Sequence, residues 1–139
     1  MPGFTELYKD RILDYTFGNT ASVTGLGTSG TLHVGLLTEM PDDGNGDGTG
    51  LTEVTGSGYA RQPITGATFA GAADGAITSA ANIVFGPAGA SWGTVVGVAV
   101  FVAATGAAHY FYDDLPTSKA IDTNDSLTIP LGDFDVSIA

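Results

Sequence analysis

The chain has 139 residues, no cysteine and a formal net charge of −11 at pH 7. Its length fits one domain with its own hydrophobic core, and the absence of cysteine excludes disulfides, thiolate nucleophiles and zinc–thiolate sites. The negative charge would repel a phosphate backbone, so we expect no nucleic acid partner. This charge is explained either as a means of staying soluble or as a complement to a basic partner surface.

Two features bear on the compartment. The longest apolar run, residues 95–104, is about half as long as a membrane-spanning helix, so we expect a soluble chain with no membrane partner. Residues 1–6 lack the basic and apolar regions of a secretory signal, so export is not expected.

Glycine, at 21 residues, is roughly twice as frequent as usual and predicts many tight turns.

The first expected element is a helix over residues 4–17. Thr5 suits its N-cap position. Aromatic and apolar side chains recur along it at helical spacing, namely Phe4, Tyr8, Ile12 and Tyr15. Glu6, Asp10 and Asp14 form an acidic line that destabilises an isolated helix, so we expect this helix to need a packing partner.

A boundary is expected after residue 30. Residues 20–30 are small, polar and rich in glycine, which favours an irregular connection over a regular element. Residues 1–30 would then comprise the helix and a connection that could serve together as a docking arm. Residues 31–139 would form the β-domain.

From residue 32 the apolar period changes to two, which is typical of β-strands. Residues 32–36 and 59–64 both alternate in this way, the second until Pro63 marks a strand end or edge. Further short strands are expected at residues 67–69 and 82–85, because turn-forming residues bound each of them.

The strongest strand signal lies at residues 94–103, where valines alternate on one face and small or apolar residues fill the other. A strand that is apolar on both faces belongs in the core. Residues 104–107 have the turn chemistry of a hairpin into residues 108–112, which the acidic pair at 113–114 would end. A change of facing parity around residues 132–133 predicts a bulge or bend.

These elements predict a mainly β fold with a short N-terminal helix. The strands would form a single antiparallel β-sandwich or jelly-roll-like domain of about seven or eight short strands.

One stretch resembles an ion site. Residues 43–48 match the first half of an EF-hand calcium loop, with oxygen-bearing side chains at Asp43, Asn45 and Asp47. The second half fails, because Glu53 stands one place before the position that the bidentate glutamate would occupy. A bound Ca²⁺ and a solvated loop rich in turn residues are the two explanations, and no other cofactor is expected.

No catalytic centre is expected, so the chain is predicted not to be an enzyme. His33 and His109 lie within strand patterns, with no nucleophile elbow of the Gly-x-Ser-x-Gly type. Asp113 and Asp114 are adjacent on an extended segment, so their side chains would point to opposite faces and not act as a glycosidase pair.

Aromatic residues at 109–112 could form a contact surface for sugars or for a protein partner, carried by whichever of Tyr110 and Tyr112 faces outward. Half-buried strand positions explain these aromatics as well. Arg61 is expected to pair with an acid that fixes the strand of Tyr59, or to form a salt bridge between subunits.

Several short motifs, in their order along the chain, resemble a family of small structural proteins from tailed bacteriophage particles. The motifs are Ile12-Leu-Asp, Phe17-Gly-Asn-Thr, Thr31-Leu-His-Val-Gly-Leu-Leu-Thr, Thr52-Glu-Val-Thr-Gly-Ser-Gly-Tyr-Ala-Arg-Gln, Trp92-Gly-Thr-Val, Phe101-Val-Ala-Ala-Thr-Gly and Asp125-Ser-Leu. In that family a short leading helix precedes a β-domain. Residues 40–50 depart from the family pattern, so the resemblance carries no support for the calcium hypothesis.

The resemblance implies a non-enzymatic component of the virion, and such proteins are labelled capsid decoration, minor tail or tail fibre proteins. Small size and the lack of fibre repeats or heptads favour a decoration (cement) protein. It would bind the outside of the shell after assembly in the host cytoplasm, and bridge subunits of the major capsid protein, with itself as a further partner in a homo-oligomer. The contacts of the arm would come from Phe4, Leu7, Tyr8 and Tyr15.

Two alternatives stay open. The first is a tail-associated protein, either a fibre part or a minor tail component, that contacts the tail or the host surface. The second is a calcium-dependent carbohydrate-binding module.

Overall fold

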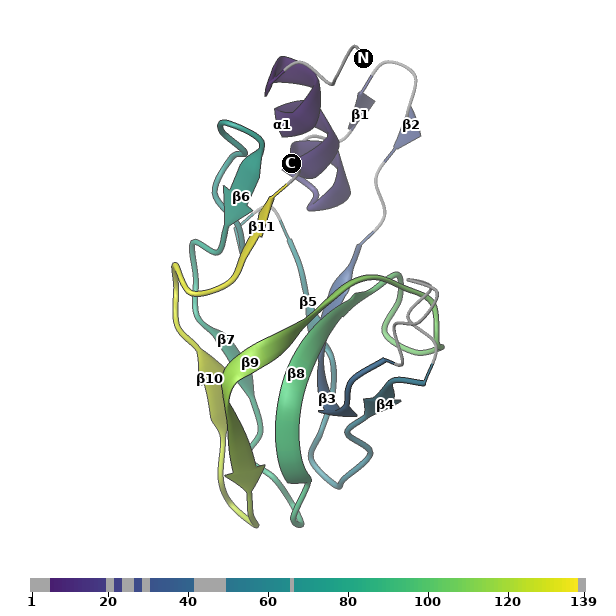
Figure 1. Cartoon of the computed structure of the whole chain (residues 1–139), viewed down its shortest axis with the longest axis vertical. Helices are drawn as coiled ribbons and strands as arrows, with labels where there is room; N and C mark the ends of the chain where they lie inside the picture. The colour runs from purple at the N-terminus through teal and green to yellow at the C-terminus, as the bar shows by residue number, and fades with distance from the viewer. Residues whose placement is uncertain are drawn as a thin grey trace. The chain divides into compact units, whose positions relative to one another are not determined.

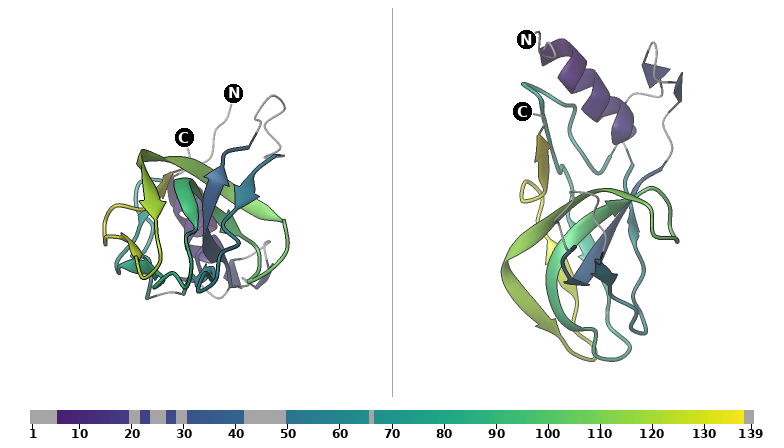
Figure 2. Two further views of the ribbon diagram at one scale, coloured as in Figure 1. Left: turned by 90° about the horizontal axis from the view of Figure 1, so that it is seen from below. Right: turned by 45° about the vertical axis from the view of Figure 1, so that its right-hand side comes forward.

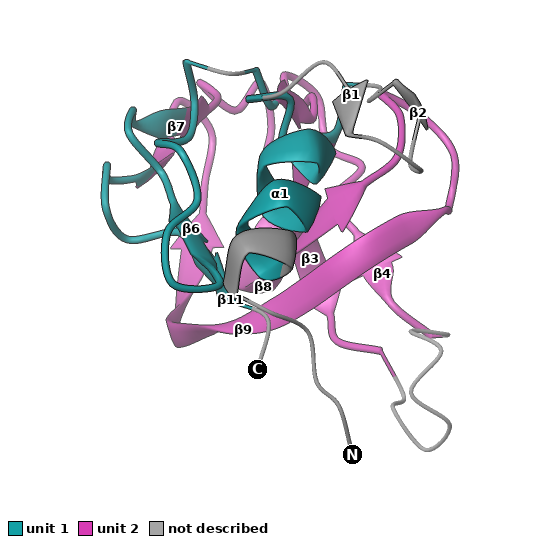
Figure 3. Cartoon of the chain, turned by 90° about the horizontal axis from the view of Figure 1, so that it is seen from above, with its two compact units in different colours: residues 1–32, 64–83, 129–139 teal, residues 33–63, 84–128 magenta. Residues whose placement is uncertain are grey.

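The computed structural model describes residues 6–19, 22–23, 27–28, 31–41, 50–65 and 67–137, with helix side chains from residue 9 onward. The fold is mainly β, with antiparallel sheets and one short helix in this part of the chain, which confirms the predicted fold class (Figure 1). The chain divides into two compact units (Figure 3). Unit 1 comprises residues 1–32, 64–83 and 129–139, and unit 2 comprises residues 33–63 and 84–128.

Unit 1 contains the helix and two short antiparallel pairs. Its elements are α1 (Glu6–Thr16), β1 (Ser22–Val23), β2 (Gly27–Thr28), β6 (Ala76–Thr78) and β11 (Asp135–Ser137). Strand β1 pairs with β2, and β6 pairs with β11. The units do not follow the predicted boundary after residue 30, because segments from the middle and the end of the chain cluster with the helix. Independent folding of residues 31–139 stays a prediction.

The inner face of α1 is buried within unit 1. Leu13 and Phe17 are almost fully buried, and the ring of Phe17 lies 4.6 Å from the ring of Phe69. The ring of Phe69 in turn meets the ring of Phe134 edge-on at 5.7 Å. This aromatic row joins the helix to segments far away in the sequence.

Two carboxylates of the acidic line of α1 contact the turn that precedes β6. The backbone N–H of Gly75 donates to Asp10 Oδ1 at 2.7 Å, and the backbone N–H of Ala72 donates to Asp14 Oδ1 at 2.6 Å. Asp74 and Gly75 both have positive φ, as a two-residue type I′ hairpin turn requires. The helix thus packs on another segment of unit 1, and its dependence on that contact stays a prediction.

A buried serine anchors the turn between the last two strands. The hydroxyl of Ser79 accepts hydrogen bonds from the N–H groups of Gly132 at 3.1 Å and Phe134 at 3.3 Å. The backbone N–H of Ser79 donates to the Phe134 carbonyl at 2.8 Å. This turn leads from β10 (Leu127–Ile129) to β11, so the bend predicted near residue 132 is confirmed.

Unit 2 is built around a five-stranded antiparallel sheet. Its strands are β3 (His33–Glu39), β4 (Thr52–Glu53), β5 (Gln62–Pro63), β8 (Gly93–Phe101) and β9 (His109–Ile121). The order is β4-β3-β8-β9, and β5 also pairs with β3. Strand β8 therefore lies between two partners and is almost wholly buried toward its end, as its apolar pattern predicts. Figure 2 shows β8 and β9 as a long curved hairpin.

A second, two-stranded sheet pairs β7 (Ile83–Phe85) with β10. The Phe85 ring stacks on Tyr59 with a centroid distance of 6.3 Å, and Trp92 meets Tyr59 edge-on at 5.5 Å. These rings pack β7 onto the segment that follows β4. The arrangement is consistent with the predicted β-sandwich.

Three strand predictions were wrong. The strand expected at residues 59–64 is reduced to β5 at residues 62–63. Strand β9 does not end at the acidic pair, since Asp113 pairs with Val98 and Asp114 with Gly97 before the strand continues to Ile121. A register shift between Val95 and Gly97 lets β9 bulge there instead of stopping. The strand expected at residues 67–69 is reduced to one isolated bridge at Phe69.

Candidate functional site

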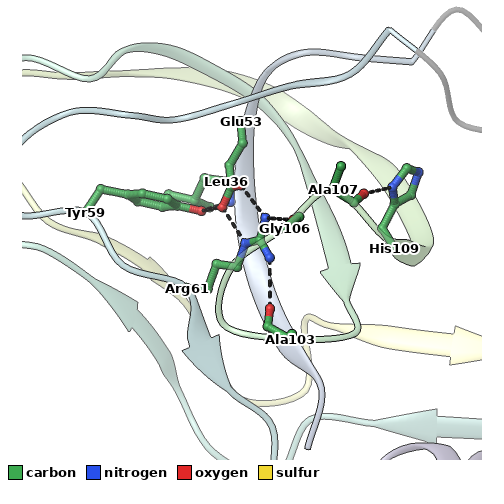
Figure 4. A network of polar contacts seen from close by, with 8 residues as sticks. All are labelled: Leu36, Glu53, Tyr59, Arg61, Ala103, Gly106, Ala107 and His109. Carbon is green, nitrogen blue, oxygen red and sulfur yellow. Dashed lines mark hydrogen bonds and ion pairs between the residues drawn. The ribbon is translucent and has the colours of Figure 1, made fainter.

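A network of polar side chains in unit 2 links β4, β5 and the loop at the end of the β8–β9 hairpin (Figure 4). Its members are Glu53, Tyr59 and Arg61. Glu53 ends β4 and Arg61 immediately precedes β5, and both of these short strands pair with β3. Tyr59 lies in the connection between those strands.

Tyr59 supplies a hydrogen bond that neither short strand provides. Strand β4 pairs with the end of β3 and β5 with its start, which leaves the N–H of Leu36 between them. This N–H donates to the Tyr59 hydroxyl at 2.9 Å, and the hydroxyl donates to Glu53 Oε1 at 2.6 Å. The Tyr59 hydroxyl thus takes the place of a strand partner for this N–H group of β3, in keeping with the rule that buried backbone groups are paired.

Arg61 donates four hydrogen bonds from the three nitrogens of its guanidinium group. Nε donates to Glu53 Oε1 at 2.8 Å and Nη2 to Glu53 Oε2 at 2.6 Å, which is the two-point geometry of a strong ion pair. Nη1 donates to the carbonyl of Ala103 at 2.8 Å, and Nη2 donates to that of Gly106 at 2.6 Å. Arg61 therefore holds the loop of residues 102–108 against the short strands.

The ion pair between Arg61 and Glu53 packs on an aromatic ring and is largely buried. The guanidinium carbon of Arg61 is 3.5 Å above the ring centroid of Phe101, a cation–π contact. The side chain of Arg61 is 6% exposed and that of Glu53 is 20% exposed. Gly35 lies beneath them, where a Cβ atom would come within 2.6 Å of the Phe101 ring and 2.9 Å of the Tyr59 hydroxyl. Glycine is the residue that leaves room for the network.

Burial raises the pKa of Tyr59 well above its ordinary value, and its hydrogen bond to the Glu53 carboxylate raises it further. The hydroxyl is therefore a fixed, neutral donor in the network. Each of these three side chains is hydrogen-bonded to another member of the network. The network is suited to fixing a loop and not to transferring a proton.

This shift predicts a loss of stability in alkali. The folded protein holds the Tyr59 proton more tightly than the unfolded chain, whose tyrosines titrate near pH 10. The free energy of unfolding should therefore be unaffected by this group below about pH 9 and fall above about pH 10, by at most about 1.4 kcal/mol per pH unit.

Tyr59→Phe should be less stable at neutral pH and lose less of its stability between neutral and alkaline pH. Urea titrations of both proteins across that range would measure this. Parallel declines in the two proteins would show that Tyr59 is not responsible.

The two aromatics predicted as contacts lie in different surroundings. The side chain of Tyr110 is 64% exposed. Tyr112 is half-buried and packs against a cluster of Leu37, Ala99 and Phe101. The ring of His109 lies 6.0 Å from those of both Phe101 and Tyr112, and its Nδ1 is 3.0 Å from the carbonyl oxygen of Ala107.

The remaining predicted site residues are only partly covered by the structure. Phe4, Asp43, Asn45 and Asp47 lie outside the described residues. Leu7 and Tyr8 lie in α1 without described side chains, and Tyr15 is half-buried on the same helix. Across residues 50–65 and the other described ranges, no group of three or more His, Asp and Glu side chains is placed to hold a metal. Ion binding by the 43–48 segment stays a prediction.

The sequence identified one half of the network. The expectation that Arg61 pairs with an acid is confirmed, and the acid belongs to the same chain. The role of Tyr59 between the short strands was missed, because it depends on two segments pairing with the same edge of β3. The sequence also made Glu53 a candidate calcium ligand, one position out of place. In the structure its carboxylate accepts hydrogen bonds from Arg61 and Tyr59.

The chain is thus a small, mainly β protein in which an ion pair holds a hairpin loop in place. The sequence matches the model of the family described as "Podophage GP4 fiber I protein gp80" over residues 3–137, and the chain belongs to this family. It is thus a structural component of a tailed-phage particle, and its partners include other virion proteins. No curated protein matches the chain. Among the described residues, no helix is both long and apolar enough to cross a membrane.

Proposed function

We propose that the chain is a fibre-associated protein on the exterior of the phage particle, and that it acts by binding other virion proteins and not by catalysis. The family match carries this proposal, because it covers nearly the whole chain and its description names a fibre protein. This favours the tail-associated alternative over the capsid decoration role that the sequence patterns suggested.

The network of Arg61, Glu53 and Tyr59 supports a binding role. A surface that keeps one conformation before it meets its partner loses less conformational entropy on binding. Arg61 fixes the backbone of the hairpin loop at Ala103 and Gly106. A structural virion protein benefits from such a loop, since its contacts must persist after assembly.

We keep the hypothesis that the N-terminal helix is a docking arm, but fewer of its residues are left to contact a partner. Leu13 and Phe17 are buried within unit 1, so this face of α1 is already occupied. Contacts with a partner would fall to Phe4, Leu7 and Tyr8, and in part to Tyr15, which is half-buried. The formation of a homo-oligomer and a contact with the major capsid protein also stay predictions.

The number of copies per particle tests the proposed location. Quantitative mass spectrometry of purified virions would compare peptides of this chain with those of the major capsid protein. A fibre-associated protein should be present at the order of tens of copies, whereas a decoration protein that follows the shell symmetry should reach the order of hundreds. A ratio near that of the major capsid protein would reject the fibre proposal, and absence from the virion would reject both locations.

A further inference from the structure

An exposed tyrosine stands on the hairpin that Arg61 braces. The β8–β9 register shifts between Val100 and Phe101, which pair with Phe111 and His109. Tyr110 is therefore the extra residue of a bulge, without a partner across the ladder. Its side chain is 64% exposed, which is unusual for a large aromatic ring in a fixed strand.

The backbone on both sides of this tyrosine is held in place. On one side, Arg61 binds the carbonyls of Ala103 and Gly106, and the residue before Tyr110, His109, packs against Phe101. On the other side, Phe111 pairs with Val100 in the ladder. The aromatic ring is thus presented by a rigid support, and a rigid aromatic anchor is what binding hot spots commonly consist of.

Two acidic residues follow the tyrosine along β9. Asp113 and Asp114 follow on the same strand, about 10 to 13 Å further along, and both are exposed. Residues 102–108 are small and carry no charge. The side chains of Asp113 and Asp114 lie on opposite faces of β9, but β9 ends the strand order of its sheet, so both border the same edge. We define the hairpin-end surface as Tyr110, the loop of residues 102–108 and the edge of β9 at Asp113 and Asp114.

We propose that the hairpin-end surface binds another virion protein that presents a basic surface with a pocket for an aromatic ring. The inference rests on the proposed function and names the chemistry of the partner. Opposite charges steer two proteins together, while the buried ring supplies most of the affinity.

Charge argues against a second copy of this chain at the same surface. The chain has fifteen Asp and Glu residues against four Lys and Arg residues. One of these four basic residues, Arg61, already forms an ion pair with Glu53 within the network. A second copy would therefore bring like charge to the acidic strand, which is unfavourable at close range.

A photocrosslinking amino acid placed at position 110 tests the contact in the assembled particle. Benzoylphenylalanine would replace Tyr110 in one phage stock and Leu131 in a control stock, since Leu131 is a comparably exposed apolar residue, at 62%. We expect irradiated virions to yield a crosslink from position 110 to a different virion protein, at a peptide rich in Lys and Arg. A crosslink to another copy of this chain, to an acidic peptide, or none at all would overturn the inference.

A paired charge experiment tests the acidic part of the surface. Asp113→Asn with Asp114→Asn removes two charges from the surface, and Asp133→Asn with Asp135→Asn removes two exposed charges elsewhere. Incorporation into particles in competition with the unmodified chain should fall about tenfold for the first pair and stay unchanged for the second. Equal effects of the two pairs would reject the inference.

The two proposals fail in different ways. If the unmodified chain is missing from purified virions, the proposed function is wrong. If the chain is present in virions and position 110 gives no crosslink to another virion protein, only the hairpin-end inference is wrong. Thermal unfolding of each variant should match that of the unmodified chain, because all substituted side chains are exposed.

Discussion

Replacing Arg61 with methionine is expected to lower the free energy of unfolding by about 3 kcal/mol. The substitution keeps an unbranched apolar side chain, but it removes the guanidinium group that lies over Phe101 and leaves the Glu53 carboxylate without its cation. It also removes the donors to the carbonyls of Ala103 and Gly106. The loss lies at the low end for buried pairs, because Glu53 is 20% exposed and water can reach it in part. Urea unfolding would measure it.

A matched control separates this effect from the loss of any positive charge. Lys119 is an exposed cation on β9, and Lys119→Met should change the free energy of unfolding by no more than about 0.5 kcal/mol. Hydrogen exchange gives a second readout, since amides of residues 102–108 should lose protection in Arg61→Met and keep it in Lys119→Met. Similar losses in both variants would show that Arg61 does not brace the loop.

Replacing Phe17 with alanine is expected to cost about 4 kcal/mol of unfolding free energy. Phe17 is 1% exposed and its ring lies against that of Phe69 within unit 1. The truncation leaves a cavity that the neighbouring aromatic residues cannot fill without moving, and the cost of a large-to-small change rises with that cavity. Urea unfolding monitored by circular dichroism would measure the loss.

The control for this prediction lies on the same helix. Arg11 is exposed, and Arg11→Ala should shift the unfolding free energy by no more than about 0.5 kcal/mol. If Phe17→Ala unfolds like the unmodified chain, the helix is a detached arm and the aromatic row is not a core. A deletion of residues 1–17 would be harder to interpret, because it removes Phe17 together with any docking residues.

Patterns of local origin were predicted well. The valine alternation of residues 94–103 specified β8 as a buried strand, and its turn residues specified the hairpin into β9. The acidic line at Asp10 and Asp14 indicated a helix that packs on another segment, because like charges at that spacing destabilise an isolated helix. These features depend on residues only a few positions apart in the chain, so they can be predicted from the sequence alone.

Features that depend on distant segments were not predicted. Strand β9 passes through Asp113 and Asp114 because β8 offers pairing partners, which outweighs the poor strand propensity of aspartate. Likewise, the hydroxyl of Tyr59 is needed because β4 and β5 leave the N–H of Leu36 between them. Neither relation follows from spacing along the chain, since each requires knowing which strands lie side by side.

The predicted site was recovered only in part for the same reason. The pairing of Arg61 with an acid could be expected, because an isolated cation in an apolar strand region is costly to bury. The identity of Glu53 as that acid depends on the way β4 and β5 border β3. Tyr110 and Tyr112 were indistinguishable in the sequence, and a register shift in the ladder decides that Tyr110 is the exposed one.

The location of the chain on the particle tests the central claim most directly. Purified virions would be labelled with gold-conjugated antibody fragments raised against this chain and viewed by electron microscopy. The fibre proposal predicts gold at the tail appendages and a bare capsid surface. Gold spread evenly over the capsid would contradict it and restore the decoration role.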